Sequence, residues 1–334
     1  MKIAVIGAGA IGGLVAAYLK IKGEDVSVVT SASSLKSIQD KGIEVSGVRG
    51  VCEAALEAQE KLSSAPDLAI LAVKTQDLEI ALKANAKFLQ SAIILTTQNG
   101  IQADQITAQF VPKENIISSI VMFGSTLNEP GRIVHNFEGS WIIGSAFGKN
   151  DSKVVEISHI LNKVFPTLVA EDILGMKVLK IFVNANNCIP AILGSSMQEV
   201  FSDVEVSKIS IAIWKEGLSI ARGAGIKLES LPDFPLERLE RLTAMPSVEA
   251  AKIFSGIMSN LSKEPLYGSI LQSIKRGKLS EIDYINGELV KIAKANKLSA
   301  PLNATLTEMV HAVETSGQFF SKAELFHLTK GLVN

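Results

Sequence analysis

The segment KIAVIGAGAIG, residues 2–12, decides the fold of the N-terminal half. It begins with an apolar run of strand length and continues as Gly-x-Gly-x-x-Gly. A helical pattern follows over 12–22 and stops before Gly23, a residue that commonly ends helices. A second apolar run over 26–30 then predicts another strand, so the segment opens a βαβ unit.

The glycines of this loop are those that a dinucleotide-binding turn needs. The first allows a tight bend, the second lets a pyrophosphate approach the backbone, and the third permits close packing of helix on strand. The anion then lies at the N-terminus of the helix. The alternative is a tight turn that binds nothing, but the strand-loop-helix context favours dinucleotide binding by Gly7, Ala8, Gly9, Ala10, Ile11 and Gly12.

The end of the second predicted strand indicates which dinucleotide is bound. Proteins that select NAD usually place Asp or Glu there to hold the ribose hydroxyls, and this chain has neither. Thr30, Ser31 and Ser33 can instead donate hydrogen bonds to a 2′-phosphate, and Lys36 can add positive charge. These residues favour NADP, with NADPH as the reduced form. The alternative interpretation is that these residues form a solvated loop with a helix cap and bind no cofactor.

Two more apolar runs, over 68–73 and 93–97, suit strands that are buried on both faces of a parallel sheet. Lys74 follows the first run, and Asn99 and Gly100 follow the second. Open α/β sheets bind ligands at the carboxyl ends of their strands, so Lys74 and Asn99 become candidates for contact with cofactor or substrate. Taken singly, Lys74 also suits a surface position and Asn99-Gly100 a simple turn.

Three later runs of strand type cover 116–122, 131–136 and 141–144. Turn residues separate them, at Pro130-Gly131 and at Glu138-Gly139. We expect these strands to complete the far edge of the same sheet.

Beyond about residue 170 the strand signals nearly vanish and long helical patterns take their place. Examples are 204–223 and 280–297, the second with a capping-box-like start at Ser280. The predicted fold is therefore an α/β Rossmann-type N-terminal domain followed by an all-α C-terminal domain. We expect the first domain to cover 1–170 and the second 171–334.

Composition excludes several classes of function. The chain has 334 residues, enough for about two domains, with 47% hydrophobic and 20% charged residues, as in ordinary globular proteins. Its 33 basic and 34 acidic residues give a net charge of -1, so no long-range positive field attracts nucleic acid or an anionic membrane. We therefore expect neither partner.

The two cysteines, Cys52 and Cys188, are far apart, and no Cys-x-x-Cys or His pair accompanies them. A disulfide framework and a zinc site are thus not indicated. The chain starts directly in a strand-like run, and no apolar stretch approaches the roughly 18 residues that a membrane span needs. We expect a soluble, cytoplasmic protein.

An unusual mixture of apolar residues and amides occupies 177–190. At about 100° per residue, Lys180, Asn184 and Asn187 share one face of a predicted helix. Amides within an apolar helix cost stability unless their hydrogen bonds are met, which points to partners supplied by a ligand. The alternatives are a polar network that joins the two domains, or a capping cluster before Pro190.

Several motifs in this order resemble those of the ketopantoate reductase family, the 2-dehydropantoate 2-reductases. Besides the glycine loop they are Val73-Lys74, Gln98-Asn99-Gly100, Gly131-Arg132-Ile133-Val134-His135, Lys180-x-x-x-Asn184, Ser269-Ile270-Leu271-Gln272 and Glu281-Ile282-Asp283-Tyr284-Ile285-Asn286-Gly287. The resemblance covers almost the whole chain, and the last motif is the most specific. It implies NADPH-dependent reduction of ketopantoate to D-pantoate, at a site in the cleft between a Rossmann domain and a helical domain.

The resemblance also implies roles for single residues. Lys180 takes the place of the catalytic lysine, and Asn184 and Ser269 are among the substrate contacts. Lys74, Asn99 and Glu281 fall on positions associated with cofactor and cleft, and Asn99 is also a candidate substrate contact. An ammonium aimed at the carbonyl oxygen can stabilise the charge that hydride transfer creates there and donate a proton. The Glu281 carboxylate can hold that lysine, or it can simply complement a helix dipole.

One position departs from the family pattern. A second asparagine commonly stands eight residues after the lysine and precedes a proline, but here that position is Cys188, with Asn187 before it and Pro190 after it. Either Asn187 takes the role or the contact is absent. A different branched 2-oxo acid as substrate and a non-catalytic dinucleotide sensor therefore stay open. A homodimer is compatible with the sequence, and the expected partner is a small 2-oxo acid.

Overall fold

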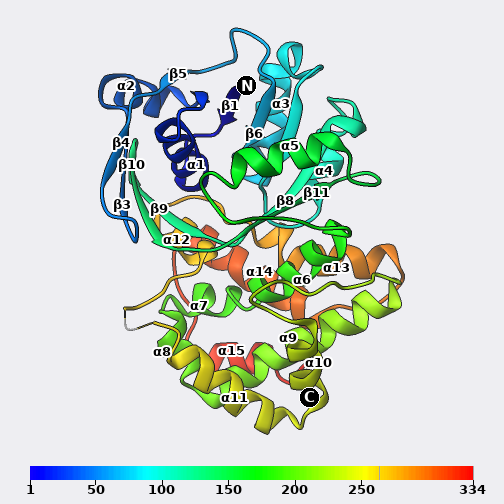
Figure 1. Cartoon of the computed structure of the whole chain (residues 1–334). Helices are drawn as coiled ribbons and strands as arrows, with labels where there is room; N and C mark the ends of the chain where they lie inside the picture. Colours follow the sequence, from blue (N-terminus) through cyan, green and yellow to red (C-terminus); the bar gives the residue numbers. More distant parts are fainter. Residues whose placement is uncertain (263, 334) are drawn as a thin grey trace. The chain divides into compact units, whose positions relative to one another are not determined.

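The computed structural model describes residues 1–262 and 264–333. It divides into two compact units, Met1–Lys177 and Val178–Asn334 (Figure 1). The first unit is α/β and the second is helical, so the predicted fold class is confirmed. The dividing point lies inside one helix, α6 (Ile173–Ala185), rather than in a linker.

The main sheet of the first unit has eight strands over the described residues. In spatial order they are β12 (Thr167–Val169), β11 (Trp141–Ser145), β8 (Ile116–Val121), β7 (Ile93–Thr96), β6 (Leu68–Leu71), β1 (Lys2–Ile6), β2 (Asp25–Val29) and β5 (Glu57–Gln59). From β8 to β5 all neighbours are parallel, whereas β11 runs antiparallel to β8. The strands predicted at 2–6, 26–30, 68–73, 93–97, 116–122 and 141–144 thus belong to this sheet.

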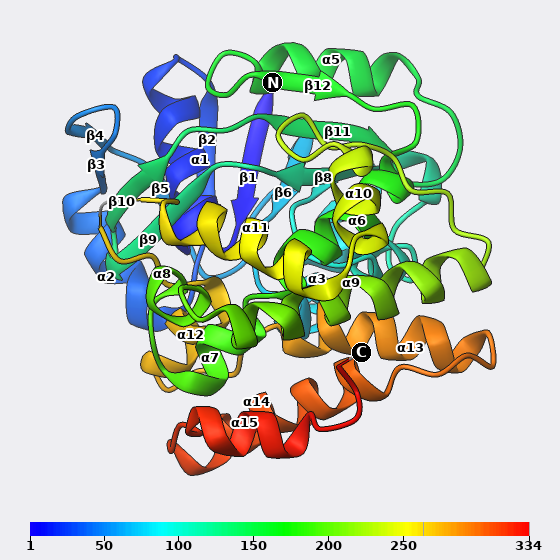
Figure 2. The same cartoon turned by 90° about the horizontal axis from the view of Figure 1, so that it is seen from below.

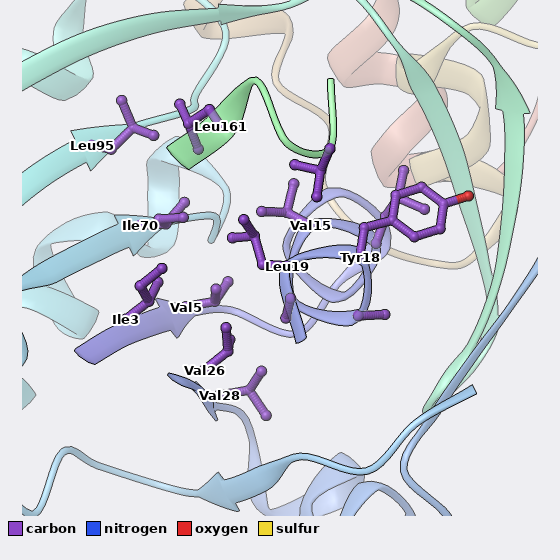
Figure 3. Packing of buried hydrophobic residues seen from close by; sticks show 14 of the residues in the cluster. Ile3, Val5, Val15, Tyr18, Leu19, Val26, Val28, Ile70, Leu95 and Leu161 are labelled. Carbon is purple, nitrogen blue, oxygen red and sulfur yellow. The ribbon is translucent and has the colours of Figure 1, made fainter. Parts of the chain in front are cut away.

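The central strands bury both faces, as their apolar sequences predict. In β1, Ile3 and Val5 join one hydrophobic cluster while Ala4 and Ile6 join the other. Successive side chains of a strand point to opposite faces, so each cluster lies on its own side of the sheet. Figure 3 shows the first cluster, where Val15 and Leu19 lie beside side chains of the strands.

The helices of this unit divide between the two clusters. The first cluster contains residues of α1 (Ala10–Ile21) and α5 (Ser152–Leu161), and the second contains residues of α3 (Thr75–Leu89) and α4 (Gln102–Thr107). Helix α2 (Ala32–Lys41) follows β2, and a short 3-10 helix, η1, covers Lys113–Asn115. The main sheet therefore has helices on both faces.

A second sheet of four strands was not predicted. Its order is β4 (Cys52–Ala54), β3 (Ile43–Gly47), β10 (Arg132–Phe137) and β9 (Gly124–Glu129). The run 131–136 was expected at the edge of the main sheet, and this expectation is wrong. Ile133 packs instead on Gly13 of α1, where an added Cβ would collide with the isoleucine side chain. The second sheet thus covers α1.

The second unit is built from helices. After α6 come α7 (Cys188–Leu193), α8 (Met197–Phe201), α9 (Val204–Gly223), α10 (Leu236–Ala244), α11 (Ser247–Ser259), α12 (Ser269–Lys275), the 3-10 helix η2 (Ile282–Tyr284), α13 (Asn286–Ala295), α14 (Pro301–Ser316) and α15 (Lys322–Leu328). Figures 1 and 2 both show α14 beside α13. Helix α9 matches the predicted 204–223, and Trp214 of α9 donates a hydrogen bond to the Phe182 carbonyl of α6 (2.8 Å).

The helix predicted over 280–297 begins later than expected. Ser280 accepts a hydrogen bond from the Ile282 backbone N-H (3.2 Å), which closes a tight turn and does not cap an α-helix. The Asp283 carboxylate lies 3.0 Å from His311 of α14 and does not complete a capping box with Ser280. The chain therefore forms η2 first, and α13 starts at Asn286.

Over 1–262 and 264–333, no helix combines the length and the apolar character that crossing a membrane requires.

Candidate functional site

Two glycines of the N-terminal loop are required by the fold itself. Gly7 has a φ of +108°, and an added Cβ would lie 2.7 Å from the Val73 backbone nitrogen. A Cβ on Gly12 would collide with the Gly7 carbonyl oxygen. Because backbone atoms cannot move aside as a flexible side chain can, the turn and the close approach of α1 to the strands depend on these two glycines.

Gly9 has a different reason to be glycine. Its φ is -78°, which any residue adopts, and a Cβ there would meet no atom within 4 Å. It is the N-cap of α1, and the first turn of that helix carries no acidic residue. Open space above the positive end of a helix dipole fits an anionic group that approaches the backbone. The residues of the loop therefore fit the pyrophosphate of a dinucleotide.

The ends of β6 and β7 bring two more predicted residues to the same edge of the sheet. Lys74 is the half-buried N-cap of α3, and Asn99 is half-buried after β7. Gln98 braces the two strand ends, since its side-chain amide donates to the carbonyls of Leu71 (2.8 Å) and Val73 (2.9 Å). Gly100 adopts a φ of +78°, as the turn interpretation of Asn99-Gly100 expects. Lys74 follows β6, Asn99 follows β7, and the glycine loop follows β1. Because these strands lie side by side in the order β7-β6-β1, the three segments leave the same edge of the sheet.

The end of β2 keeps polar groups without a carboxylate. Ser31 is the N-cap of α2, whose first turn has no acidic residue. The hydroxyls of Ser31 and Ser33 lie 2.9 Å apart, and Lys36 is exposed. The hydroxyls and the positively polarised N-terminus of α2 together suit the binding of a phosphate group.

Helix α6 carries Lys180 and, one turn later, Asn184. Both side chains are half-buried. Burial lowers the pKa of Lys180 to about 8, because removing an ammonium from water disfavours its charged form. At neutral pH the amine is therefore still largely protonated but gives up its proton more readily than an exposed lysine does.

A second lysine on the same helix was not assigned a role from the sequence. Lys177 is buried and its ammonium lies 2.9 Å from Asp104 Oδ2 and 2.9 Å from Ser118 Oγ. Thr96 completes the group, because its hydroxyl donates to Asp104 Oδ1 (2.5 Å). All four residues belong to the first unit. Lys177 is thus part of a buried, hydrogen-bonded ion pair with a structural role.

Asn187, which was predicted to share one helical face with Lys180 and Asn184, lies outside α6. Helix α6 ends at Ala185, and Asn186 and Asn187 form a turn before α7 begins at Cys188. The Asn187 backbone N-H donates to the Asn184 carbonyl (2.9 Å), which tightens the chain there.

Asn186, which the sequence analysis did not single out, is the exceptional residue of this turn. Its side chain is 4% exposed, and neither its oxygen nor its nitrogen has a hydrogen-bond partner among the described residues. An unsatisfied buried amide costs roughly 1–3 kcal/mol, so a bound partner would offset a real penalty. The amide-rich composition of 177–190 was the signal that could have identified it.

Asn187 lies beside the segment that carries Ser269. A Cβ added to Gly268 would come within 3.1 Å of the Asn187 side chain and 3.0 Å of Met197. Gly268 is the N-cap of α12, which starts at the exposed Ser269. The structure therefore brings two predicted substrate contacts, Asn187 and Ser269, into one neighbourhood of the second unit.

The segment 281–287 is tied to α7 and α14. The buried Asn286 amide contacts the Cys188 sulfur (3.7 Å) and donates to Asn303 Oδ1 (3.0 Å). Burial raises the pKa of Cys188 to about 12, so it stays a neutral thiol. Cys188 thus packs inside the unit, while the half-buried Glu281 precedes η2. In the part of the chain that the structure describes, no group of His, Cys, Asp and Glu could hold a metal ion.

The family model described as ketopantoate reductase PanE/ApbA matches residues 3–147, and its C-terminal counterpart matches residues 172–314. The chain belongs to the ketopantoate reductase family. A 2-dehydropantoate 2-reductase of Pyrococcus horikoshii is 31% identical to it over 95% of this chain and 99% of the relative.

Solved structures of other proteins share the fold. A D-mandelate dehydrogenase, determined with NADH and anilino(oxo)acetate, superposes with a TM-score of 0.81 at 25% identity and covers 95% of this chain and 99% of its own. A ketopantoate reductase family protein of Ralstonia eutropha gives 0.80 at 22% identity, with 94% and 99% covered, which speaks for the fold alone.

Proposed function

We propose that the protein reduces 2-dehydropantoate to D-pantoate with NADPH. The match to a 2-dehydropantoate 2-reductase over nearly the full length of both chains carries this proposal. The glycine loop, with its open position at Gly9 and no acidic residue in the first turn of α1, fits the dinucleotide. Lys74 and Asn99 would contact the same cofactor at the neighbouring strand ends.

The preference for NADPH over NADH rests on the end of β2. Thr30, Ser31 and Ser33 present hydroxyls there, and Lys36 lies in the helix that follows. A carboxylate at this place would repel a 2′-phosphate, and the described residues of this loop carry none. The structurally similar D-mandelate dehydrogenase was solved with NADH, which supports a nicotinamide dinucleotide as the cofactor and leaves its preference for the assay.

In the proposed reaction the side chains of the second unit manage the proton and the substrate. NADPH, when bound by the glycine loop, would supply a hydride for the 2-oxo carbon. Lys180 donates a proton to the carbonyl oxygen as negative charge builds up on it, and its lowered pKa suits a group that must part with a proton near neutral pH. Glu281 would hold the ammonium in place as a carboxylate partner.

Amides and a hydroxyl would bind the rest of the substrate. Asn184, Asn187 and Ser269 are the proposed contacts in the second unit, and Asn99 is a further one in the first. Asn186 joins them because its buried amide has no hydrogen-bond partner among the residues that the structure describes. A carboxylate or hydroxyl of the substrate would satisfy such an amide.

A second candidate is an NADPH-dependent reductase of another branched or aromatic 2-oxo acid. Cys188 at the position of a common family asparagine favours it, as does the likeness to a D-mandelate dehydrogenase. Cys188 is buried against Asn286 and makes no amide available for a ligand. The difference between the two candidates therefore concerns the substrate alone.

Steady-state assays with purified protein test both candidates. Oxidation of NADPH and of NADH is followed optically with ketopantoate, with the 2-oxo acid that corresponds to mandelate, and with a branched aliphatic 2-oxo acid. We expect the highest kcat/KM for ketopantoate with NADPH. A higher kcat/KM for another 2-oxo acid would make that acid the substrate. No turnover with any acid would favour a non-catalytic dinucleotide sensor.

Three further expectations belong to this proposal. We propose that the protein acts in the cytoplasm, that it binds no nucleic acid, and that it forms a homodimer. Sedimentation of the purified protein with and without NADPH measures the last of these.

A further inference from the structure

The imidazole of His311, on α14, lies between two carboxylates. Its Nδ1 is 3.0 Å from Glu314 Oε2, and its Nε2 is 3.0 Å from Asp283 Oδ1. A carboxylate oxygen only accepts hydrogen bonds, and a neutral imidazole has one N-H and one lone pair. Both contacts can be hydrogen bonds only when the ring is protonated on both nitrogens. The two contacts together therefore favour the imidazolium form.

The two carboxylates hold the chain on either side of Glu281. Asp283 stands two residues after it, in η2. The other oxygen of Glu314, Oε1, accepts a hydrogen bond from the backbone N-H of Ser280 (2.7 Å). Glu281 itself is bound into the turn, because its carbonyl accepts from the Tyr284 N-H (3.0 Å). The segment that carries Glu281 is thus fastened to α14 at both ends.

We propose that protonated His311 is a positioning residue, which clamps residues 280–283 onto α14 and so fixes Glu281 for the reaction. This inference rests on the proposed function, in which Glu281 holds the catalytic lysine. Loss of the proton would leave one ring nitrogen facing a carboxylate without a hydrogen. The clamp would then open on one side.

The other elements that pack against α14 bring no competing charge onto the ring. Helix α7 has Cys188 as its one titratable group, and Cys188 contacts Asn286. On α9, Glu216 accepts from the backbone of Leu302 and Asn303, at the opposite end of α14.

On α13, Lys291 lies over the Tyr284 ring (5.1 Å), while Glu288 is buried and Lys294 stands in the last turn. Burial of His311 opposes its charge, but the hydrogen bonds that the ring donates to Glu314 and Asp283 outweigh it and raise the pKa of His311. A group with a raised folded pKa contributes fully at low pH and loses its contribution as pH rises through that value. The clamp is therefore complete in mildly acidic solution and opens as pH rises.

The first test compares the pH profile of kcat for the wild type, His311→Lys and His311→Gln. A lysine keeps a positive charge and several donors for both carboxylates throughout this range, whereas a glutamine never carries the charge. At about pH 6 we expect His311→Gln to be roughly two- to fivefold slower than wild type and His311→Lys to match it. As pH rises, the wild type should fall toward His311→Gln in a step separate from the decline that Lys180 causes, and His311→Lys should lack that step.

Coincident profiles for all three proteins, or an unchanged step in His311→Lys, would overturn the proposal. NADPH affinity, measured by fluorescence, should be equal in all three because the loop that binds it lies in the other unit.

The second test does not depend on any substrate. The pKa of His311 is measured by NMR titration in the wild type and in Asp283→Asn. We expect the variant to have the lower pKa, and an equal pKa would mean that the clamp does not form. If the wild type reduced no 2-oxo acid at any pH, the proposed function would fail, while this titration would still decide whether the clamp exists.

Discussion

The glycine loop and the turn between α6 and α7 are two candidate binding regions built in opposite ways. In the loop the backbone does the work: Gly7 and Gly12 are fixed by close backbone contacts, and Gly9 leaves space open. In the turn, side chains matter: Asn186 is buried without a partner, and Asn187 lies against Gly268. The positions of glycines in the sequence predict a site formed by the backbone. A site formed by side chains can be predicted only when the end of the helix is known.

The largest expected effect comes from two matched substitutions on α6. Lys180→Met should lower kcat by about 10² to 10⁴, because it removes the proton donor, and should leave NADPH affinity and thermal stability nearly unchanged. Lys177→Met makes the same chemical change one turn earlier, but it leaves the buried Asp104 without its counter-charge. We expect it to lower the free energy of unfolding by about 3–5 kcal/mol.

Stopped-flow turnover and urea unfolding of both variants measure the two quantities. Near-normal turnover by Lys180→Met would remove this lysine from the mechanism. Unchanged stability of Lys177→Met would show that the ion pair with Asp104 is not formed.

The pH dependence of kcat tests the role of Lys180 on the same helix. Lys180 must be protonated to donate during reduction, and burial sets its pKa to about 8. We therefore expect kcat for reduction to fall about tenfold per pH unit above that value, when chemistry limits the rate, in addition to the smaller step that His311 causes. Oxidation of D-pantoate should show the reverse slope, since the amine then accepts the proton. A reduction rate that stays level to about pH 10 would contradict the assignment.

Most of the first unit could be predicted because its signals are local. The runs that became β1, β2, β6 and β7 are apolar along their length, as strands buried on both faces must be. The second sheet escaped prediction because β9 is half-exposed and polar and β4 is short. Its strands are held by pairing with each other and by contact with α1, which no single segment encodes.

The site in the second unit was only partly predictable. Lys180 and Asn184 lie one turn apart on a helix, as the spacing predicts, but the same spacing continued through 186–187, where the structure has a turn. The ending of α6 depends on tertiary contacts, so periodicity gave no warning of it. The structural role of Lys177 depends on Asp104, which lies in α4 far away in the sequence.

A pair of glycine substitutions tests the backbone region. Gly9→Ala adds a methyl group that meets no protein atom within 4 Å, so stability should stay unchanged while the methyl occupies the space proposed for the pyrophosphate. We expect the Kd for NADPH to rise about tenfold or more, which is about 1.4 kcal/mol. Gly12→Ala, the control, forces a methyl onto the Gly7 carbonyl and should lower stability by about 1–3 kcal/mol as well.

Calorimetric titration with NADPH and thermal unfolding separate the two outcomes. If Gly9→Ala bound NADPH as tightly as the wild type, the open position would not be the cofactor cradle.

The smallest effects distinguish the two amides of the turn. The buried Asn186 amide has no hydrogen-bond partner among the described residues, which costs stability. Asn186→Leu should therefore leave the free energy of unfolding of the ligand-free protein unchanged or raise it by up to about 1–3 kcal/mol. If its amide binds substrate, the same change should raise KM by roughly three- to tenfold. Asn187→Leu is the matched control. It should raise KM by a similar factor without the gain in stability, because its half-buried side chain is not an unsatisfied core group. A loss of stability in Asn186→Leu with an unchanged KM would mean that this amide serves the fold, and the substrate contacts would then reduce to Asn184, Asn187 and Ser269.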